Sequence, residues 1–160
     1  MIIVGVDPGL AACGWAVVAA PQPVAVASGV IRTSPKPSEP ERVAIVADRM
    51  AELIVRHRPW AVALEAYVQR WSSHRASAGS HIQVARVVGA LGQLCRSLHV
   101  PCYEYSAALW MRAIIGPRRN GLTAGEAVRL RLGLAAAPPE HAADAIGVAL
   151  YHAAAARPSA

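Results

Sequence analysis

Short apolar runs rich in β-branched residues alternate with longer amphipathic stretches along this chain. Residues 2–7 form one such run, which ends at Pro8-Gly9 and is typical of a buried strand. Residues 14–20 and 24–33 predict two more strands, joined by a turn at Pro21-Gln22-Pro23. Further strands are predicted at 60–64, just before Glu65, and at 101–105. The first three strands therefore predict an antiparallel meander.

The amphipathic stretches predict helices with recognisable ends. Residues 34–40 carry three prolines and predict a loop, and a helix is expected after Pro40, ending before Pro59. Its apolar face comprises Val43, Val46, Ala47, Met50, Leu53 and Ile54. Residues 66–80 are polar, basic and aromatic, and predict a loop that runs into a helix ending near residue 98.

The C-terminal third predicts three more helices. Ser106 can cap a short helix that ends at Gly116, and Thr123 with Glu126 three residues later forms a capping box for the next one. Pro138-Pro139 opens a last helix that reaches about residue 156, with proline in its first turn.

The order of these elements predicts an α/β fold. Three consecutive strands, then strands that alternate with helices, give a mixed five-stranded sheet that combines the antiparallel meander with parallel strands and is flanked by helices. No internal repeat or second domain is evident, so residues 1–157 are expected to form a single domain and 158–160 a frayed tail.

Composition narrows the function classes. Hydrophobic residues make up 54% and charged residues 16% of the chain, which argues against disorder. No apolar run reaches the roughly 20 residues of a membrane span, and the first residues lack a signal peptide's basic head, so we expect a cytoplasmic protein without a membrane partner. Cys13, Cys95 and Cys102 are expected to be reduced thiols, because their number is odd and no C-x-x-C spacing occurs.

The charge balance favours a polyanionic partner. Sixteen basic residues, almost all arginine, stand against ten acids, giving a formal charge of +6 and a pI near 9.9. Arginine binds phosphate with a planar fork of donors, which suits nucleic acid. Many basic proteins bind no nucleic acid, so this observation needs a motif beside it.

The few acids are placed where they can act together. Asp7 ends the first predicted strand and Glu65 ends the fourth, so they lie side by side if these strands are neighbours. Asp144 interrupts an apolar helix, and His141 three residues earlier lies on the same helical face. Three carboxylates and one imidazole suit Mg²⁺ or Mn²⁺ better than zinc.

Each of these residues also has a simpler interpretation. Asp7 can be a turn former before Pro-Gly, Glu65 a surface acid at the start of a loop, and Asp144 the partner of a nearby arginine. His141 alone is more often structural than a ligand, and Glu140 can take its place because it lies one helical turn from Asp144. The acids are more convincing as a set than singly.

Several segments together resemble the RuvC-type Holliday-junction resolvases (crossover junction endodeoxyribonucleases). The segments are Val4-Gly5-Val6-Asp7-Pro8-Gly9, Ala63-Leu64-Glu65, Val100-Pro101-Cys102-Tyr103-Glu104-Tyr105 and His141-Ala142-Ala143-Asp144-Ala145. The resemblance implies an RNase H-like fold and a homodimer that makes paired, symmetric nicks across a four-way DNA junction. It also implies a branch-migration helicase as a further partner.

The resemblance assigns the catalytic and metal-binding roles to Asp7, Glu65, His141 and Asp144. It implies phosphodiester hydrolysis with two Mg²⁺ ions per active site, for which Mn²⁺ can substitute. Asp7 would then contact both ions, while Glu65 and the His141/Asp144 pair would each hold one.

The chain departs from the family pattern in its basic residues and in one loop. Where the family carries lysines that help to bind or cleave DNA, this chain has Met111-Arg112 and Gly125. The loop after Glu65 is longer than usual and carries aromatic and basic side chains that can stack on unpaired bases and contact phosphates. The predicted DNA-binding residues are Tyr67, Arg70, Trp71, His74, Arg75, Arg112, Arg118 and Arg119.

Other functions stay open at this point. The chain could be a related RNase H-like nuclease that acts on RNA, flaps or forks, or a non-catalytic protein that binds branched DNA. An actin-like phosphotransferase also starts with a strand that leads to an Asp-Gly-type turn, but 160 residues are too few for its two lobes.

Overall fold

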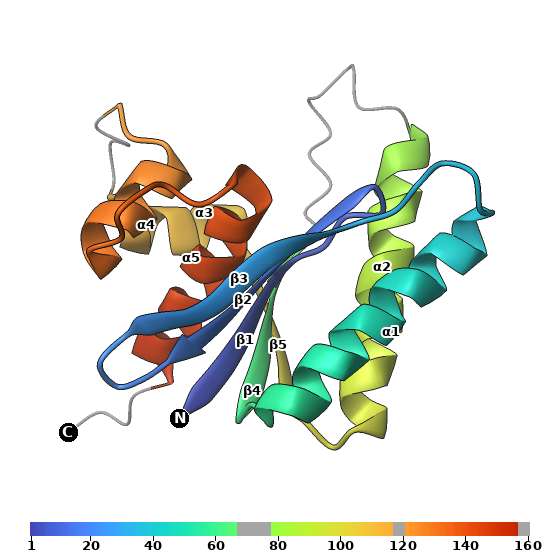
Figure 1. Ribbon diagram of the computed structural model, residues 1–160, viewed down its shortest axis with the longest axis horizontal. Helices are drawn as coiled ribbons and strands as arrows, with labels where there is room; N and C mark the ends of the chain where they lie inside the picture. Colours follow the sequence, from blue (N-terminus) through green and yellow to red (C-terminus); the bar gives the residue numbers. More distant parts are fainter. Residues whose placement is uncertain (67–77, 117–120, 157–160) are drawn as a thin grey trace.

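The computed structural model of the chain describes residues 1–66, 78–116 and 121–156, which form three layers with one sheet in the middle (Figure 1). The sheet contains five strands in the order β3-β2-β1-β4-β5. They are β1 (Ile2–Asp7), β2 (Ala12–Ala19), β3 (Val24–Arg32), β4 (Ala61–Ala66) and β5 (Cys102–Ser106). Neighbours among β1, β2 and β3 pair antiparallel, whereas β4 is parallel to both β1 and β5. The predicted α/β fold with a mixed sheet is confirmed.

Helices cover both faces of the sheet (Figure 1). On one face lie α1 (Glu39–His57) and α2 (Ala78–Ser97), and on the other lie α3 (Ala107–Ile114), α4 (Ala124–Leu132) and α5 (Glu140–Ala155). None of the helices in the described ranges is long and apolar enough to span a membrane.

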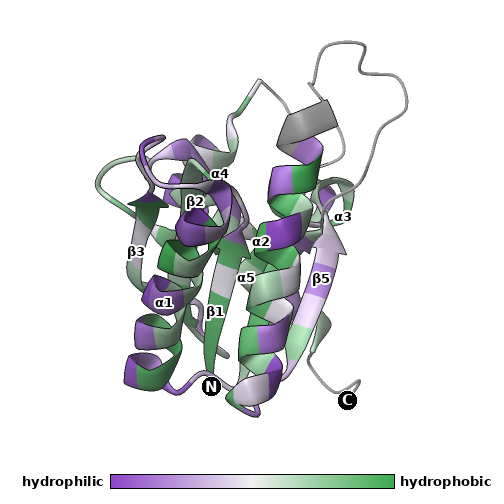
Figure 2. Cartoon of the chain, turned by 90° about the vertical axis from the view of Figure 1, so that its right-hand side faces the viewer, coloured by the Kyte–Doolittle hydropathy of each residue, from purple (hydrophilic) through white to green (hydrophobic). Residues whose placement is uncertain are grey.

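The alternation of side chains along each strand divides the core into two parts. Val4, Val6 and Val62 point to the side of α1 and α2, where they pack with buried residues of both helices. Ile3 and Ala63 point to the opposite side and pack against α5. In Figure 2, β1 is mostly hydrophobic, while α1 and α2 in front of it carry both hydrophilic and hydrophobic positions, as expected of helices with one face in solvent.

Helix α5 is the most deeply buried of the described helices. Ten of its 16 residues are buried, and it contacts β1, β2, β3 and β4 as well as α3 and α4. Its many alanines explain this position, because small side chains let a helix backbone lie close to a sheet. The helix is therefore fixed along its length against the strands that carry the candidate site.

The element boundaries differ from the sequence prediction at two prolines. Helix α1 begins at Glu39 and not after Pro40, because Ser38 is the N-cap and its backbone N–H donates to Glu41 Oε2 at 2.7 Å. Proline is tolerated in a first turn because the N–H it lacks would have no partner within the helix. Helix α5 begins at Glu140, so Pro139 is its N-cap and not part of its first turn.

The remaining boundaries shift by one or two residues. The capping box of Thr123 and Glu126 is confirmed: the Glu126 N–H donates to Thr123 Oγ1 at 3.2 Å, and the Thr123 N–H donates to Glu126 Oε2 at 2.9 Å. Strand β4 continues one residue past Glu65, so this carboxylate lies within the strand and not after it.

Candidate active site

Asp7 and Glu65 come from two strands that are neighbours in the sheet. The parallel register pairs Val6 of β1 with Leu64 of β4, so the two acids that follow lie side by side. Asp7 continues the face that carries Ile3 and Gly5, and Glu65 continues the face of Ala63. Both carboxylates therefore point to the side of the sheet that α5 covers, at the carboxyl ends of their strands.

Two glycines let the start of α5 approach these strands. A Cβ atom on Gly14 of β2, which pairs with Asp7, would overlap the backbone carbonyl of His141. A Cβ atom on Gly5 would overlap the carbonyl oxygen of Ala145 and lie 2.8 Å from the Ala149 Cβ. Glycine is thus the residue type that allows α5 to bring His141 and Asp144 over the strand ends.

His141 contacts Asp7 directly. Its Nδ1 lies 2.7 Å from Asp7 Oδ2, and the two side chains are 44% and 18% exposed. With the carboxylate ionised, Nδ1–H donates to it, which puts the lone pair of the neutral ring on Nε2. This arrangement fixes the ring plane and gives Nε2 the chemistry of a metal ligand or a base.

Glu65 is held by a residue that the sequence prediction did not include. The indole Nε1–H of Trp110 donates to Glu65 Oε2 at 2.8 Å, from a side chain that is fully buried in the core around α5. Gly147 makes room for this ring, because a Cβ atom there would lie 2.5 Å from the indole. Trp110 is a positioning residue, since it orients one oxygen of the candidate catalytic carboxylate.

Burial, together with neighbouring negative charge, raises the pKa of all three acids. Burial and the negative charges of Asp7 and Glu65 raise the pKa of Asp144 to about 7, with Glu140 adding to the effect and His141 opposing it. Burial raises the pKa of Asp7, although the hydrogen bond from His141 opposes that rise. Burial likewise raises the pKa of Glu65, against the hydrogen bond from Trp110. The site is therefore a partly buried cluster of negative charge.

The donor set fits a hard divalent cation. Carboxylate oxygens are the ligands that Mg²⁺ and Mn²⁺ prefer, and a cation relieves the repulsion that raises the pKa of Asp144. Within the described ranges, however, no three His, Cys, Asp or Glu side chains are grouped closely enough to hold a metal ion as they lie. Asp7 Oδ2 and Glu65 Oε2 each accept a hydrogen bond, from His141 and Trp110 respectively, and these bonds orient the two carboxylates.

The predicted DNA-binding residues fall mostly on segments that the structure leaves undescribed. Arg112 is exposed on α3. The other predicted positions, Tyr67, Arg70, Trp71, His74, Arg75, Arg118 and Arg119, lie in 67–77 and 117–120, outside the described residues.

Two features of the site, the close approach at Gly14 and the contact of Trp110 with Glu65, were not predicted from the sequence, and only the first has a local signal. Gly14 interrupts an apolar strand, and an isolated glycine in a strand can indicate that another backbone approaches closely. Trp110 gave no such signal, because its partner Glu65 lies 45 residues away in the sequence and on another element.

Comparison with known proteins gives a consistent result. Residues 3–152 match the family described as "Crossover junction endodeoxyribonuclease RuvC". A protein of that name from Halorhodospira halophila is 36% identical over 154 residues, which cover 94% of this chain and 89% of the relative. Another from Thermus thermophilus is 34% identical over 163 residues, covering 96% and 93% of the two chains.

Solved structures agree with this match. The structure of Thermus thermophilus RuvC superposes with a TM-score of 0.80 at 32% identity, covering 96% of this chain and 93% of the other. The same protein in complex with a Holliday junction substrate gives a TM-score of 0.80 at 31% identity, with coverage of 96% and 92%. A yeast mitochondrial Holliday junction resolvase, at 13% identity and a TM-score of 0.60, shares the fold and covers 94% of this chain and 75% of its own.

Proposed function

This chain belongs to the crossover junction endodeoxyribonuclease RuvC family, and we propose that it cuts four-way DNA junctions by hydrolysing phosphodiester bonds at the site formed by Asp7, Glu65, His141 and Asp144. Enzymes of this family are metal-dependent nucleases. A solved relative, Thermus thermophilus RuvC, is described in complex with a Holliday junction substrate, and this supports branched DNA as the substrate here.

The observation that carries the proposal is the crowding of acids. Asp7, Glu65 and Asp144 come from β1, β4 and α5, and the like charges of the first two help to raise the pKa of the third to about 7. A domain without a cation to bind would gain nothing from three half-buried carboxylates in this position, because each of them costs desolvation energy.

We propose two Mg²⁺ ions per site, with Mn²⁺ as a substitute, held by Asp7, Glu65, Asp144 and His141. Bound metal supplies the hydroxide nucleophile and neutralises the charge that develops on the leaving oxygen. The chain's own residues prepare the ligands for it. The Trp110 indole fixes one oxygen of Glu65, and Asp7 orients the His141 ring so that Nε2 carries the lone pair.

The binding energy for DNA is expected to be mainly electrostatic. The chain carries a formal charge of +6, and its exposed arginines, Arg112 among them, can contact phosphates on either side of the cut. Affinity should therefore fall steeply with salt concentration.

A homodimer is part of the proposal, because symmetric cuts in two opposed strands need two sites related by a twofold axis. Helix α2 offers a surface for it: Ala85 and Gly89 are exposed, and, apart from the adjoining backbone of the helix, no atom of the described residues lies within 4 Å of a Cβ built on Gly89 or Gly92. Because Ala85 and Gly89 are exposed, they do not pack on the protein's own sheet. We further propose a branch-migration helicase as a partner, which rests on the family alone.

The test is a cleavage assay with Mg²⁺ on five substrates: a four-way junction, a flap, a fork, a plain duplex and an RNA–DNA hybrid. We expect the junction to be cut fastest, by paired nicks at symmetric positions. Asp7→Asn is expected to abolish cleavage and to leave junction binding intact, because the variant loses a metal ligand but keeps the arginines. Preference for the flap, the fork or the hybrid would replace the proposed substrate, and an Asp7→Asn protein that cuts at the wild-type rate would overturn the assigned site.

A further inference from the structure

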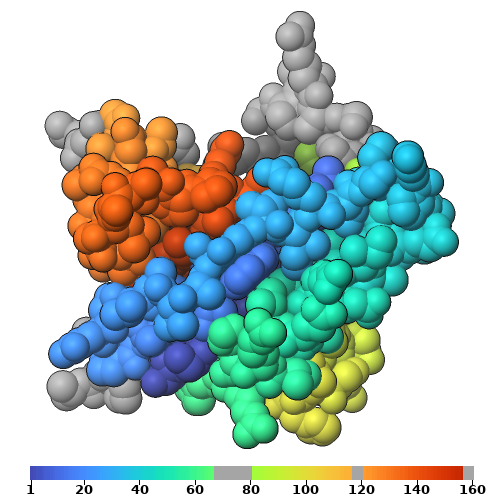
Figure 3. Space-filling model, viewed as in Figure 1, coloured from blue at the N-terminus to red at the C-terminus, as the bar shows by residue number. Residues whose placement is uncertain are grey.

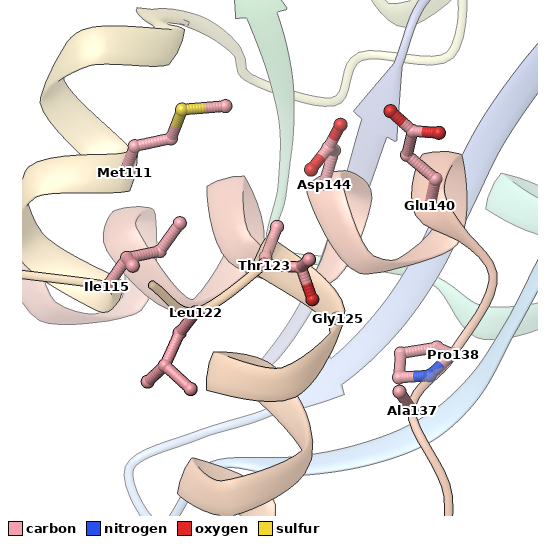
Figure 4. A pocket seen from close by; sticks show the side chains of 10 residues that line it. Met111, Ile115, Leu122, Thr123, Gly125, Ala137, Pro138, Glu140 and Asp144 are labelled. Carbon is pink, nitrogen blue, oxygen red and sulfur yellow. The ribbon is translucent and has the colours of Figure 1, made fainter. Parts of the chain in front are cut away.

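A cavity of about 460 Å³ opens beside the acidic cluster, between α3, α4 and the start of α5. Asp144 and Glu140 form part of its wall, and Met111 of α3 lies across from them (Figure 4). The remaining lining residues are Ile115, Leu122, Thr123, Ala124, Gly125, Ala137 and Pro138. In the space-filling view, α4 and the start of α5 project at the upper left of the molecule (Figure 3). The cavity and the candidate active site therefore share Asp144.

The described lining residues disfavour phosphate as the group that enters the cavity. Among the described lining residues the only charges are those of Glu140 and Asp144, which are negative and repel an anion. The rest of the wall is mainly apolar, and Met111 can adapt its shape because methionine is unbranched and flexible. An uncharged, flat and mostly apolar group matches this lining, as in other pockets that bind small ligands.

The substrate carries such a group next to the bond that is cut. The phosphate under attack must lie at the carboxylates, and the adjoining nucleoside is bonded directly to that phosphate, so it lies within reach of Asp144. A base in an intact duplex is held in its stack, whereas an unpaired base at a branch point leaves the stack at lower cost.

We propose that this cavity is the subsite for the nucleoside that adjoins the cut bond, and that it accepts the base of that nucleoside only where the strand is unstacked at the branch. This inference rests on the proposed function and extends it. The cavity makes cleavage depend on the branch point, because only there does that base leave the stack at low cost, and it does so without a positive charge from the described lining residues.

Ala137 is the position at which to block the cavity. It lies in the turn before α5, its side chain is exposed, and it lines the cavity without belonging to the buried core or the acidic cluster. Ala137→Leu therefore narrows the cavity with little effect on folding. Ala135→Leu is the matched control, because Ala135 is exposed in the same turn and does not line the cavity.

The first experiment measures single-turnover cleavage of junctions in which the base on one or the other side of the mapped cut is replaced by an abasic site. We expect the wild-type protein and Ala135→Leu to lose about tenfold in rate for one of the two positions, the scale on which apolar pockets discriminate. Ala137→Leu should cut the intact junction about tenfold more slowly and show no further loss on the abasic one. Equal rates on intact and abasic junctions for the wild-type protein would overturn the proposal while leaving the nuclease function intact.

A second measurement needs no cleavage. Junctions with 2-aminopurine at each position around the branch are bound without divalent cation, and the fluorescence reports whether that base unstacks. We expect a rise at one position with the wild-type protein and with Ala135→Leu, and a smaller rise with Ala137→Leu. No rise at any position, or an equal rise with all three proteins, would refute the subsite even if the protein proved inactive as a nuclease.

Discussion

The indole of Trp110 allows a direct test of how the acidic site is held. Its Nε1–H donates to Glu65 Oε2 at 2.8 Å, and its ring lies against Gly147. Trp110→Phe keeps an aromatic ring in this buried space and removes the donor. We expect a folded protein whose Glu65 side chain is no longer fixed, so that it binds metal less well.

The size of the effect follows from the contact that is lost. A hydrogen bond to a charged group contributes about 1.5–3 kcal/mol. Glu65 is only half-buried, so water can replace part of the lost interaction and the effect should lie at the lower end of that range. A change of about 1.4 kcal/mol corresponds to tenfold, so the metal concentration for half-maximal cleavage should rise about tenfold.

The pH dependence should shift in a defined direction. The Trp110 hydrogen bond lowers the pKa of Glu65, whose burial raises it, so removing the bond lets that pKa rise further. The carboxylate is then protonated at a higher pH than in the wild-type protein. The acidic side of the pH–rate profile of Trp110→Phe should move to higher pH.

The assay compares cleavage rates over a range of Mg²⁺ concentrations and pH, together with calorimetric metal binding in the absence of DNA. Trp60→Phe is the control, because Trp60 is 48% exposed and its ring stacks on His152, away from the acids. A Trp110→Phe protein that melts earlier but keeps the wild-type metal and pH dependence would refute the reasoning, because Trp110 would then only support the core.

Six other variants test separate parts of the site and the assembly. His141→Asp should retain cleavage, because a carboxylate can replace a neutral imidazole as a ligand, and His141→Ala should lose most of it. A protonated imidazole cannot bind metal, so cleavage by the wild-type protein should fall more at acidic pH than cleavage by His141→Asp. Identical pH–rate profiles for these two proteins would remove His141 from the site. Asp144 has a folded-state pKa of about 7, above its ordinary value, so the stability of the metal-free protein against urea should fall as pH rises from about 4 to about 7. Asp144→Asn should reduce this fall, and an equally steep fall in the variant would contradict the cause given for the raised pKa. Gly89→Leu should weaken the dimer in sedimentation experiments, and a wild-type protein that is active as a monomer at micromolar concentration would rule the dimer out. Tyr67→Ala and Trp71→Ala should each lose junction cleavage while keeping cleavage of a nicked duplex and the melting temperature; early melting with equal loss on all substrates would mean that both residues belong to the core.

The layout of the fold could be predicted because it follows from local signals. Apolar runs that end at Pro8-Gly9 or at Pro59 define strands and helix ends, and the order of strands and helices restricts the sheet to a mixed arrangement. The predicted helix starts are wrong at Pro40 and Pro139, because α1 begins one residue before Pro40 and α5 begins one residue after Pro139. A proline is compatible with several positions around a helix start, so its presence does not fix the first residue.

The side-chain geometry of the site could be predicted only in part. Spacing predicted that His141 and Asp144 share a helical face, and strand order predicted that Asp7 and Glu65 are neighbours. The contact between Trp110 and Glu65 depends on how α3 packs against α5, which no local pattern determines. Such contacts form between elements far apart in the sequence, and they decide how precisely a carboxylate is held.

Because α5 packs closely on the sheet, the candidate active site should persist only as long as the whole domain stays folded. The helix that carries His141 has ten buried residues and lies over Gly5 and Gly14 at backbone distance, so it cannot lift away without exposing much of the core. Its central amides should then exchange with solvent only when the domain unfolds globally. We therefore expect activity and tertiary structure to disappear together when the protein is heated.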